Sequence, residues 1–206
     1  MNVVEAKDVK MSFRIPGQPA IEVLKGIDLS VAPGEKVAIV GRSGAGKSTL
    51  LHILGGLLKP TSGLVSLPRN FGFVFQAYHL FPELTVLENV VLPTEARGKI
   101  RGGAAKIRAK ELLEAVGLKD RMDHLPAELS GGERQRAALA RALVTDPAVV
   151  FADEPTGNLD ALTGADILKM LTDLSKGETA LVMVTHSREA AAICDRTLTL
   201  ADGRLA

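Results

Sequence analysis

The chain has 206 residues, of which 46% are hydrophobic, so it is long enough to bury a core and too apolar for a disordered chain. Its 25 basic and 24 acidic residues nearly cancel, which argues against nucleic-acid binding and against a polybasic membrane surface. No segment approaches the roughly 18 apolar residues of a membrane-spanning helix, so we expect no direct membrane insertion.

The amino-terminal residues predict an antiparallel β element. Residues 3–13 and 21–31 are strand-like and flank the turn-forming sequence Pro16-Gly17-Gln18-Pro19. The charged start, from Met1 onward, is typical of a first strand and differs from a signal peptide. The single cysteine, Cys194, excludes an internal disulfide and suits a reducing cytoplasm; its alanine-rich neighbourhood predicts a buried, unreactive thiol.

A glycine-rich stretch follows the next predicted strand, at 37–40. It reads Gly41-Arg42-Ser43-Gly44-Ala45-Gly46-Lys47-Ser48 and matches the G-x-x-x-x-G-K-[ST] phosphate loop. The glycines allow a tight turn whose N–H groups face phosphate oxygens, Lys47 adds a positive charge, and Ser48 is placed to hold Mg²⁺. The helix that continues with Thr49 directs the positive end of its dipole at the same anion. The stretch predicts a nucleoside triphosphate site.

Most of the aromatic residues lie close together in the sequence. Five of the seven fall within eleven positions: Phe71, Phe73, Phe75, Tyr78 and Phe81. The first three alternate, which predicts one face of a core strand. The last two, with Leu80, lie in a loop-like segment that ends in proline, where aromatic side chains favour contact with a partner. We hypothesise that this segment contacts a helix of a partner protein.

The segment from Leu129 to Arg136, reading LSGGERQR, opens a predicted helix that continues to Val144. Ser130 and Glu133 have the spacing of a capping box, which requires no function. Gly131 and Gly132 are poor helix formers, so their presence in a first turn favours close approach of an anion to the helix N-terminus.

Two further strand ends carry polar side chains. The apolar run at 149–152 ends in Asp153 and Glu154; Asp153 could hold Mg²⁺ through its water shell, and Glu154 could activate a water as general base. Alternatively, both only begin the turn at Pro155, but the phosphate loop favours the catalytic interpretation. The run at 180–185 ends in His186, at the edge where open α/β sheets bind ligands.

Short apolar runs alternate with helical patterns, and this order predicts an α/β fold with a mainly parallel sheet. The strand-like runs are 37–40, 73–75, 148–151 and 180–184, and the helical patterns are 104–116, 133–144 and 162–174. We expect one domain over residues 1–206, with an inserted helical lobe at about 77–140.

Together and in this order, the phosphate loop, the Leu-Ser-Gly-Gly segment and the Asp-Glu strand end resemble the ATPase subunits of ATP-binding cassette proteins, over nearly the whole chain. The resemblance implies a P-loop NTPase core with an antiparallel β-lobe, ATP and Mg²⁺ as cofactors, and an ATP-dependent homodimer. It also implies that Ser130 to Gly132 bind the γ-phosphate held by the facing subunit, and that the partner at Tyr78 and Phe81 is a transmembrane permease.

The resemblance also assigns roles to single residues. Gln76 resembles the Q-loop glutamine that reaches Mg²⁺ and the attacking water, Asp160 lies in the D-loop at the dimer interface, and His186 is the switch histidine. Phe13 corresponds to the aromatic that stacks on adenine, although it could equally be core. The predicted catalytic residues are Lys47, Gln76, Glu154 and His186, and the predicted metal ligands are Ser48, Gln76 and Asp153. The predicted nucleotide-binding residues are Phe13, Gly41, Arg42, Ser43, Gly44, Ala45, Gly46, Lys47, Ser48, Thr49, Gln76, Ser130, Gly131, Gly132, Asp153, Glu154, Asp160 and His186.

Several shorter sequence segments resemble one branch of the family. Residues 52–57, 60–63, 87–90, 129–136 and 152–160 are similar to the ATPase of the lipoprotein-releasing system, whose relatives serve macrolide export and cell division. Two departures stand out. The chain is shorter than the pattern between Gly63 and Phe71, which predicts a shortened β-lobe, and Ser187 stands where an acidic residue commonly follows the histidine.

The branch leaves several functions open. The first is a transporter subunit on the cytoplasmic face of the inner membrane; the second is a cassette ATPase that regulates division or cell-wall machinery without transport. A weakly hydrolysing regulatory module is a third, because the β-lobe is shortened. A DNA-repair ATPase is disfavoured by the lack of coiled coils, and a GTPase by the lack of an Asn-Lys-x-Asp sequence.

Overall fold

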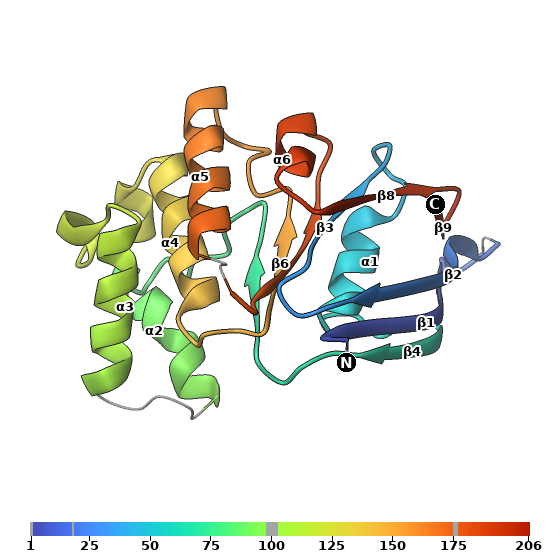
Figure 1. The fold of residues 1–206 in the computed structure, drawn as a ribbon, viewed down its shortest axis with the longest axis horizontal. Coiled ribbons are helices and arrows are strands. Elements are labelled where there is room, and N and C mark those ends of the chain that lie inside the picture. Colours follow the sequence, from blue (N-terminus) through green and yellow to red (C-terminus); the bar gives the residue numbers. More distant parts are fainter. Residues whose placement is uncertain (1, 18, 98–102, 175–176) are drawn as a thin grey trace.

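The chain forms two β-sheets with helices between and beside them, in a computed structural model that describes residues 2–17, 19–97, 103–174 and 177–206 (Figure 1). Met1 and Gln18, which the sequence analysis assigns to the first strand and to the turn after it, lie outside these residues. The described elements are β1 (Val4–Phe13), β2 (Ile21–Val31), β3 (Lys36–Val40), α1 (Lys47–Leu54), β4 (Ser62–Ser66), β5 (Phe71–Val74), α2 (Val86–Arg97), α3 (Gly103–Ala115), η1 (Lys119–Arg121), η2 (Pro126–Glu128), α4 (Gly131–Leu143), β6 (Val149–Asp153), α5 (Ala161–Leu174), β7 (Ala180–Val184), α6 (Arg188–Ala192), β8 (Arg196–Ala201) and β9 (Arg204–Leu205).

The larger sheet has the strand order β5-β6-β7-β3-β8-β9. Its pairings are parallel except for the last, between β8 and β9, which confirms the predicted mainly parallel sheet. The carboxyl ends of parallel strands meet at one edge of a sheet. β3, β6 and β7 are neighbours, so the phosphate loop, the Asp153-Glu154 pair and His186 all follow strands at that edge.

The side chains of β6 and β7 alternate between two hydrophobic cores. Val149 and Phe151 belong to a core shared with α1 and the smaller sheet, whereas Val150 and Ala152 belong to a core shared with α2, α3, α4 and α5. Successive side chains of a strand point to opposite faces, so a sheet covered on both faces needs a continuous apolar run. The fully buried sequences of β6 and β7 meet this need.

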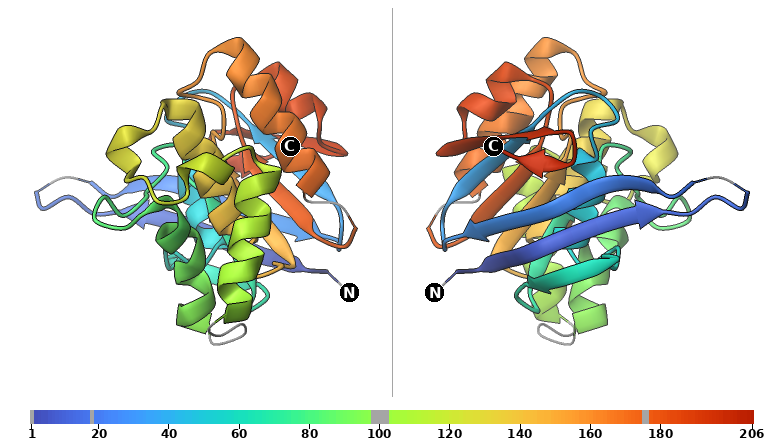
Figure 2. Two further views of the ribbon diagram at one scale, coloured as in Figure 1. Left: turned by 90° about the vertical axis from the view of Figure 1, so that its left-hand side faces the viewer. Right: turned by 90° about the vertical axis from the view of Figure 1, so that its right-hand side faces the viewer.

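The smaller sheet is antiparallel, with the order β2-β1-β4, and lies over α1 (Figure 2). Val4 pairs with Val31 and Phe13 with Ile21, which confirms the predicted pairing of the first two strands. Residues 67–70 connect β4 to β5, and the lobe being shorter than in the family stays a prediction.

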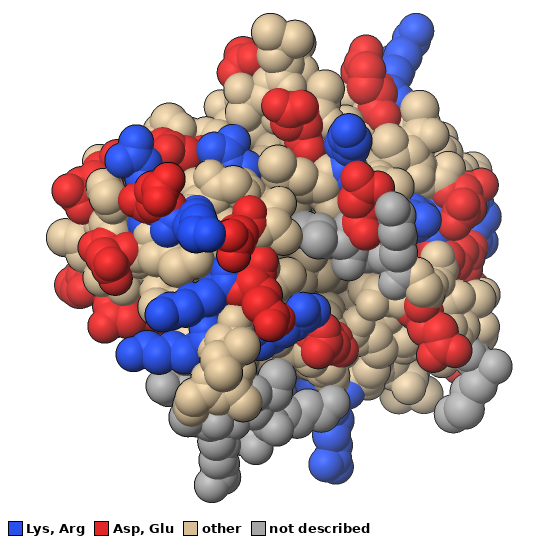
Figure 3. Space-filling view, turned by 60° about the vertical axis from the view of Figure 1, so that its left-hand side comes forward, with Lys and Arg blue, Asp and Glu red and all other residues tan. Residues whose placement is uncertain are grey.

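Helices α2, α3 and α4 pack on one another beside the larger sheet, at the left of Figure 1. The helices expected at 104–116, 133–144 and 162–174 are α3, α4 and α5, with bounds that differ by no more than two residues. Acidic and basic side chains are interspersed over the visible surface of these helices (Figure 3). Within the described ranges, no helix has both the length and the apolar character needed to cross a membrane.

Candidate functional site

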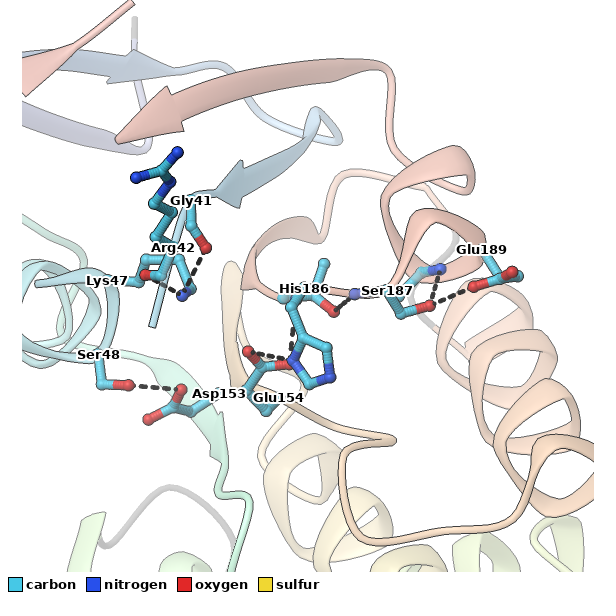
Figure 4. A network of polar contacts seen from close by, with 11 residues as sticks. Gly41, Arg42, Lys47, Ser48, Asp153, Glu154, His186, Ser187 and Glu189 are labelled. Carbon is cyan, nitrogen blue, oxygen red and sulfur yellow. Dashed lines mark hydrogen bonds and ion pairs between the residues drawn. The ribbon is translucent and has the colours of Figure 1, made fainter. Parts of the chain in front are cut away.

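The phosphate loop connects β3 to α1 and holds Lys47 inside its turn. Gly46 precedes α1 with a φ of 96°, and a Cβ there would lie 2.6 Å from Val23 Cγ1, so only glycine fits. Lys47 is 9% exposed, and its Nζ donates to the carbonyl oxygens of Gly41 (3.0 Å) and Arg42 (3.1 Å) (Figure 4). The ammonium group therefore lies beside the N-terminus of α1. Its charge and the positive end of the helix dipole both attract an anion.

Asp153, at the end of β6, faces two side chains of α1. Ser48 Oγ donates to Asp153 Oδ1 at 3.0 Å, and His52 Nε2 lies 3.6 Å from Asp153 Oδ2. Burial raises the pKa of Asp153, and the hydrogen bond from Ser48 opposes the rise. His52 is not among the predicted site residues; its position four residues after Ser48, on the same helix face, is the signal that could have found it.

Glu154 and His186 form a pair at the ends of β6 and β7. His186 Nδ1 lies 2.9 Å from Glu154 Oε1, and the backbone N–H of His186 donates to Glu154 Oε2 at 3.2 Å (Figure 4). The imidazole is 69% exposed, whereas the Glu154 side chain is 12% exposed. Glu154 has a φ of 43°, a left-handed conformation that costs energy in a residue other than glycine and is typical of functional sites.

A single cleft brings the predicted catalytic groups together. Its lining residues are Val23, Ser43, Gly44, Gly46, Lys47, Ser48, Thr49, Gln76, Glu154 and His186. Gln76 follows β5, and its backbone carbonyl accepts a hydrogen bond from Asn158 Nδ2 at 3.0 Å. Gly41, Arg42 and Ala45 line an adjoining cleft that shares Ser43 and Gly44 with the first. The structure therefore places all four predicted catalytic residues around the phosphate loop.

The Leu-Ser-Gly-Gly segment does not line that cleft. Ser130 Oγ accepts from the Glu133 N–H (3.3 Å), and the Glu133 carboxylate accepts from the Ser130 N–H (2.8 Å), as the capping box predicts. The two glycines also allow close internal packing: a Cβ on Gly132 would lie 2.6 Å from Thr163 Cγ2, and one on Gly131 would lie 3.2 Å from the Tyr78 hydroxyl. Anion binding at this helix end stays a prediction.

Asp153 is not among the lining residues of the cleft either, although it contacts Ser48, and the predicted nucleotide-binding residues Phe13 and Asp160 also lie outside it. Phe13, at the end of β1, is 40% exposed and is not among the lining residues. Asp160 caps α5: its carboxylate accepts from the backbone N–H groups of Leu162 and Thr163 (3.1 Å each) and from the Thr163 hydroxyl (2.6 Å). Within one chain, Asp160 therefore has a structural role.

Ser187, where the sequence departs from the family pattern, caps the short helix α6. Its hydroxyl accepts from the Ala190 N–H at 3.1 Å and donates to Glu189 at 2.7 Å. Serine is a preferred N-cap residue, so the residue at this departure caps the helix that follows His186.

The aromatic cluster divides between core and surface. Phe73 is 8% exposed, stacks on Phe75 at 4.3 Å between ring centroids and lies near Phe151, as expected for core residues. In the loop that follows, Phe81 is 51% exposed. Tyr78 is half-buried beneath the Arg134 guanidinium, and Leu80 packs against the helical core. Of the three loop residues predicted to contact a partner, only Phe81 is widely exposed.

Cys194 is expected to be almost unreactive in the native protein. The thiol is half-buried, and burial raises its pKa to about 11, so thiolate is scarce at pH 8. Because the thiolate is the reacting species, modification by a thiol reagent at pH 8 should be on the order of 100-fold slower than in a peptide. Urea-unfolded protein is the control and should react at the peptide rate; equal rates before and after unfolding would contradict the prediction.

A phosphate loop at a strand end, with carboxylates and a histidine on the neighbouring strands, defines the chain as a P-loop nucleoside triphosphate hydrolase. The family model described as ABC transporter matches residues 24–157. The chain belongs to the ABC transporter family, and it is an ATP-hydrolysing subunit of the kind found in these transporters.

Individual relatives agree with this assignment. The lipoprotein-releasing system ATP-binding protein LolD of Legionella pneumophila (strain Paris) is 49% identical, over 92% of this chain and 91% of that protein. LolD of Acinetobacter baylyi is 49% identical over 219 aligned residues, covering 98% of this chain and 96% of that protein. The alignment is longer than the 206-residue chain, so the relative has positions that this chain lacks.

Solved structures have the same fold. The dimeric structure of MJ0796, described as a bacterial ABC transporter cassette, gives a TM-score of 0.88 at 39% identity and covers 98% of this chain and 96% of that one. A dimeric post-hydrolysis state of MJ0796 bound to ADP and Pi gives a TM-score of 0.87 at the same identity and coverage. These matches confirm the predicted ABC ATPase fold, with its P-loop core, antiparallel sheet and helical lobe.

Proposed function

We propose that this chain is the ATP-hydrolysing subunit of a lipoprotein-releasing transporter, on the cytoplasmic face of the membrane that holds its permease. The observation that carries the proposal is the 49% identity to two LolD proteins over nearly the whole chain. ATP hydrolysis in two copies of the chain would drive a conformational change in the permease, because loss of the γ-phosphate removes contacts that favour the closed dimer.

Two half-sites on one chain support the dimer. The cleft around Lys47 lacks the Ser130 to Gly132 segment, which lies at the N-terminus of α4. A facing copy can supply that segment, so that each ATP binds between the phosphate loop of one copy and the α4 N-terminus of the other. Both solved structures of MJ0796 are described as dimeric, which supports a dimer of this chain. Asp160 would then lie near the interface.

Within each composite site, the cleft residues have distinct proposed roles. Glu154 is the general base: its carboxylate is largely buried, faces the cleft and is held by His186 through two contacts. Lys47 neutralises the β- and γ-phosphates, and the exposed imidazole of His186 contacts the γ-phosphate. Gln76 lines the same cleft from the loop after β5 and contacts the attacking water.

Ser48 and Asp153 fit a magnesium ion that arrives with ATP. Their side-chain oxygens lie 3.0 Å apart beside the phosphate loop, and Mg²⁺ prefers one or two protein oxygens together with phosphate oxygens and water. No group of three or more His, Cys, Asp or Glu among the described residues forms a separate metal site. When bound, the ion would neutralise charge on the phosphates, and Gln76 would be a further ligand.

We also propose that the permease docks a helix in an apolar groove beside the Gln76 loop. The groove, here called the aromatic groove, is lined by Leu57, Phe71, Phe75, Phe81 and Pro93, among others. Leu57 and Phe81 are 52% and 51% exposed, although both are large and apolar. Exposed aromatic side chains beside a pocket are typical of interaction sites. Docking here would place the permease within a few residues of Gln76.

Replacing Leu57 and Phe81 together by serine is expected to weaken permease binding at least tenfold, because two apolar anchors are lost. Folding and basal hydrolysis should remain, since neither side chain lines the nucleotide cleft. Capture of the permease by tagged protein in detergent measures the effect. Ile107→Ser is the matched control, because Ile107 is 61% exposed on α3 and does not line the groove. Undiminished capture by the double variant would contradict the docking site.

The function itself is tested by reconstitution. Proteoliposomes that contain the permease and an acylated lipoprotein should release the lipoprotein on addition of this chain and ATP, and not with the Glu154→Gln variant. Capture of a division or cell-wall protein without lipoprotein release would instead support a non-transport ATPase.

A further inference from the structure

Arg141 is a buried arginine that the proposed mechanism does not use. It lies in the last turn of α4 and is only 9% exposed. Across the described ranges of the chain, no carboxylate lies within ion-pair distance of its guanidinium. Burial lowers its pKa to about 10. A buried charge without a counter-charge is costly, so its hydrogen-bond partners indicate what the residue does.

Those partners are two successive backbone carbonyls. Arg141 Nη2 donates to the carbonyl oxygen of Tyr78 at 2.6 Å, and Nη1 donates to that of His79. A planar guanidinium can span two adjacent acceptors in this way, whereas an ammonium group is a point donor. The geometry therefore requires arginine in particular.

The turn held by Arg141 is strained. Tyr78 and His79 have φ values of 62° and 48°, a left-handed conformation that is uncommon in residues other than glycine. The turn closes through hydrogen bonds from the Tyr78 N–H to Phe75 (3.1 Å) and from the His79 N–H to Ala77 (2.6 Å). Such a conformation persists only where surrounding contacts impose it, and the guanidinium supplies two of them.

The same turn lies directly after Gln76, in the nucleotide cleft, and leads to Phe81, in the aromatic groove. Arg141 and His79 also line that groove. At the other end of α4, Gly131 lies close to the same residue: a Cβ added to it would be 3.2 Å from the Tyr78 hydroxyl. One buried side chain thus fastens the Gln76 loop to the helix whose N-terminus carries the Leu-Ser-Gly-Gly segment.

We propose that Arg141 is a positioning residue for ATP hydrolysis: its guanidinium fixes the Tyr78–His79 turn and thereby keeps Gln76 in place in the nucleotide cleft. The inference rests on the role proposed above for Gln76. It does not involve the phosphate loop, since Arg141 touches neither Lys47 nor Ser48. Loss of the guanidinium should therefore affect turnover rather than ATP binding.

The test is a double-mutant cycle in the full chain with the variants Arg141→Lys, Gln76→Ala and both together. We expect Arg141→Lys to lower kcat by roughly 10- to 100-fold, the scale of a 1 Å misplacement, while KM for ATP stays within about twofold. The double variant should hydrolyse ATP at the rate of Gln76→Ala alone, because both changes remove the same contribution. Arg108→Lys is the control and should behave as wild type. Arg108 pairs with Asp146 on the surface of the same lobe.

Several outcomes would overturn the inference. An unchanged kcat in Arg141→Lys would do so, and so would effects of the two substitutions that multiply in the double variant, since a purely structural residue would act independently of Gln76. An unchanged kcat in Gln76→Ala would refute the role of Gln76 itself, and the inference with it. If the lysine variant does not fold, Arg141→Gln replaces it in the cycle, because it removes the buried charge and retains an amide donor.

Discussion

The Glu154→Gln variant is expected to bind ATP normally, to hydrolyse it about 100- to 10,000-fold more slowly than wild type, and to accumulate as an ATP-bound dimer. Glutamine has nearly the same shape as glutamate but cannot accept a proton, so only the general-base contribution is lost. The carboxylate is 12% exposed and in contact with His186, and the amide can occupy the same space. Hydrolysis and the size of the protein by light scattering on a sizing column measure the two effects.

Glu178→Gln is the matched control for this variant. Glu178 is exposed and precedes β7 at the edge of the sheet opposite to the cleft, so its substitution should change neither turnover nor size. Normal turnover by Glu154→Gln would exclude the general-base role. A variant that binds ATP and stays monomeric would show that closure of the dimer requires another component, such as the permease.

The Asp153→Asn variant is expected to lose hydrolysis at least 100-fold while the nucleotide-free protein becomes more stable. The loss follows from the role proposed for the carboxylate beside Ser48, since a metal ion supplies several kcal/mol of charge stabilisation. The gain has a separate cause: burial raises the pKa of Asp153, so the ionised group destabilises the native state at neutral pH. Asparagine removes that charge.

The stability of the two proteins should differ with pH in a defined direction. Below the ordinary pKa of 3.8, Asp153 is protonated in both the native and unfolded states, and the variant should have no advantage. As the pH rises through the raised native pKa, wild type loses stability relative to the variant, and above it the difference is complete. Urea unfolding in the presence of a chelator measures this difference. A variant less stable than wild type at pH 7 would show that the Ser48 and His52 contacts outweigh the burial of the charge.

The site on the larger sheet could be predicted because its chemistry lies in consecutive residues. The phosphate loop, the Asp153-Glu154 pair and His186 each follow an apolar run, and the parallel sheet that the alternation of runs predicts brings those ends to one edge. Strand pairing at the amino terminus and the main helices were predictable for the same reason, since each is set by local periodicity.

Contacts between distant segments could not be predicted in this way. The approach of His52 to Asp153 depends on how α1 lies against β6, and that of Arg141 to Tyr78 depends on how α4 lies against the loop after β5. Nor does any local pattern show that Gly132 faces Thr163, a contact that accounts for one of the glycines without an anion. Tyr78 was predicted at the surface for a related reason. Its sequence is typical of a surface loop, but in the fold its ring lies under the Arg134 guanidinium.

The division of β6 and β7 between two hydrophobic cores bears on how the chain unfolds. Val150 packs in the core of the helical lobe, and its neighbour Phe151 packs in the core beside α1. Unfolding of either core therefore disrupts the strand that both cores share. Neither lobe keeps a complete core when the other melts. Denaturation should therefore be a single cooperative event despite the two-lobed architecture, and neither lobe should fold when expressed as a fragment.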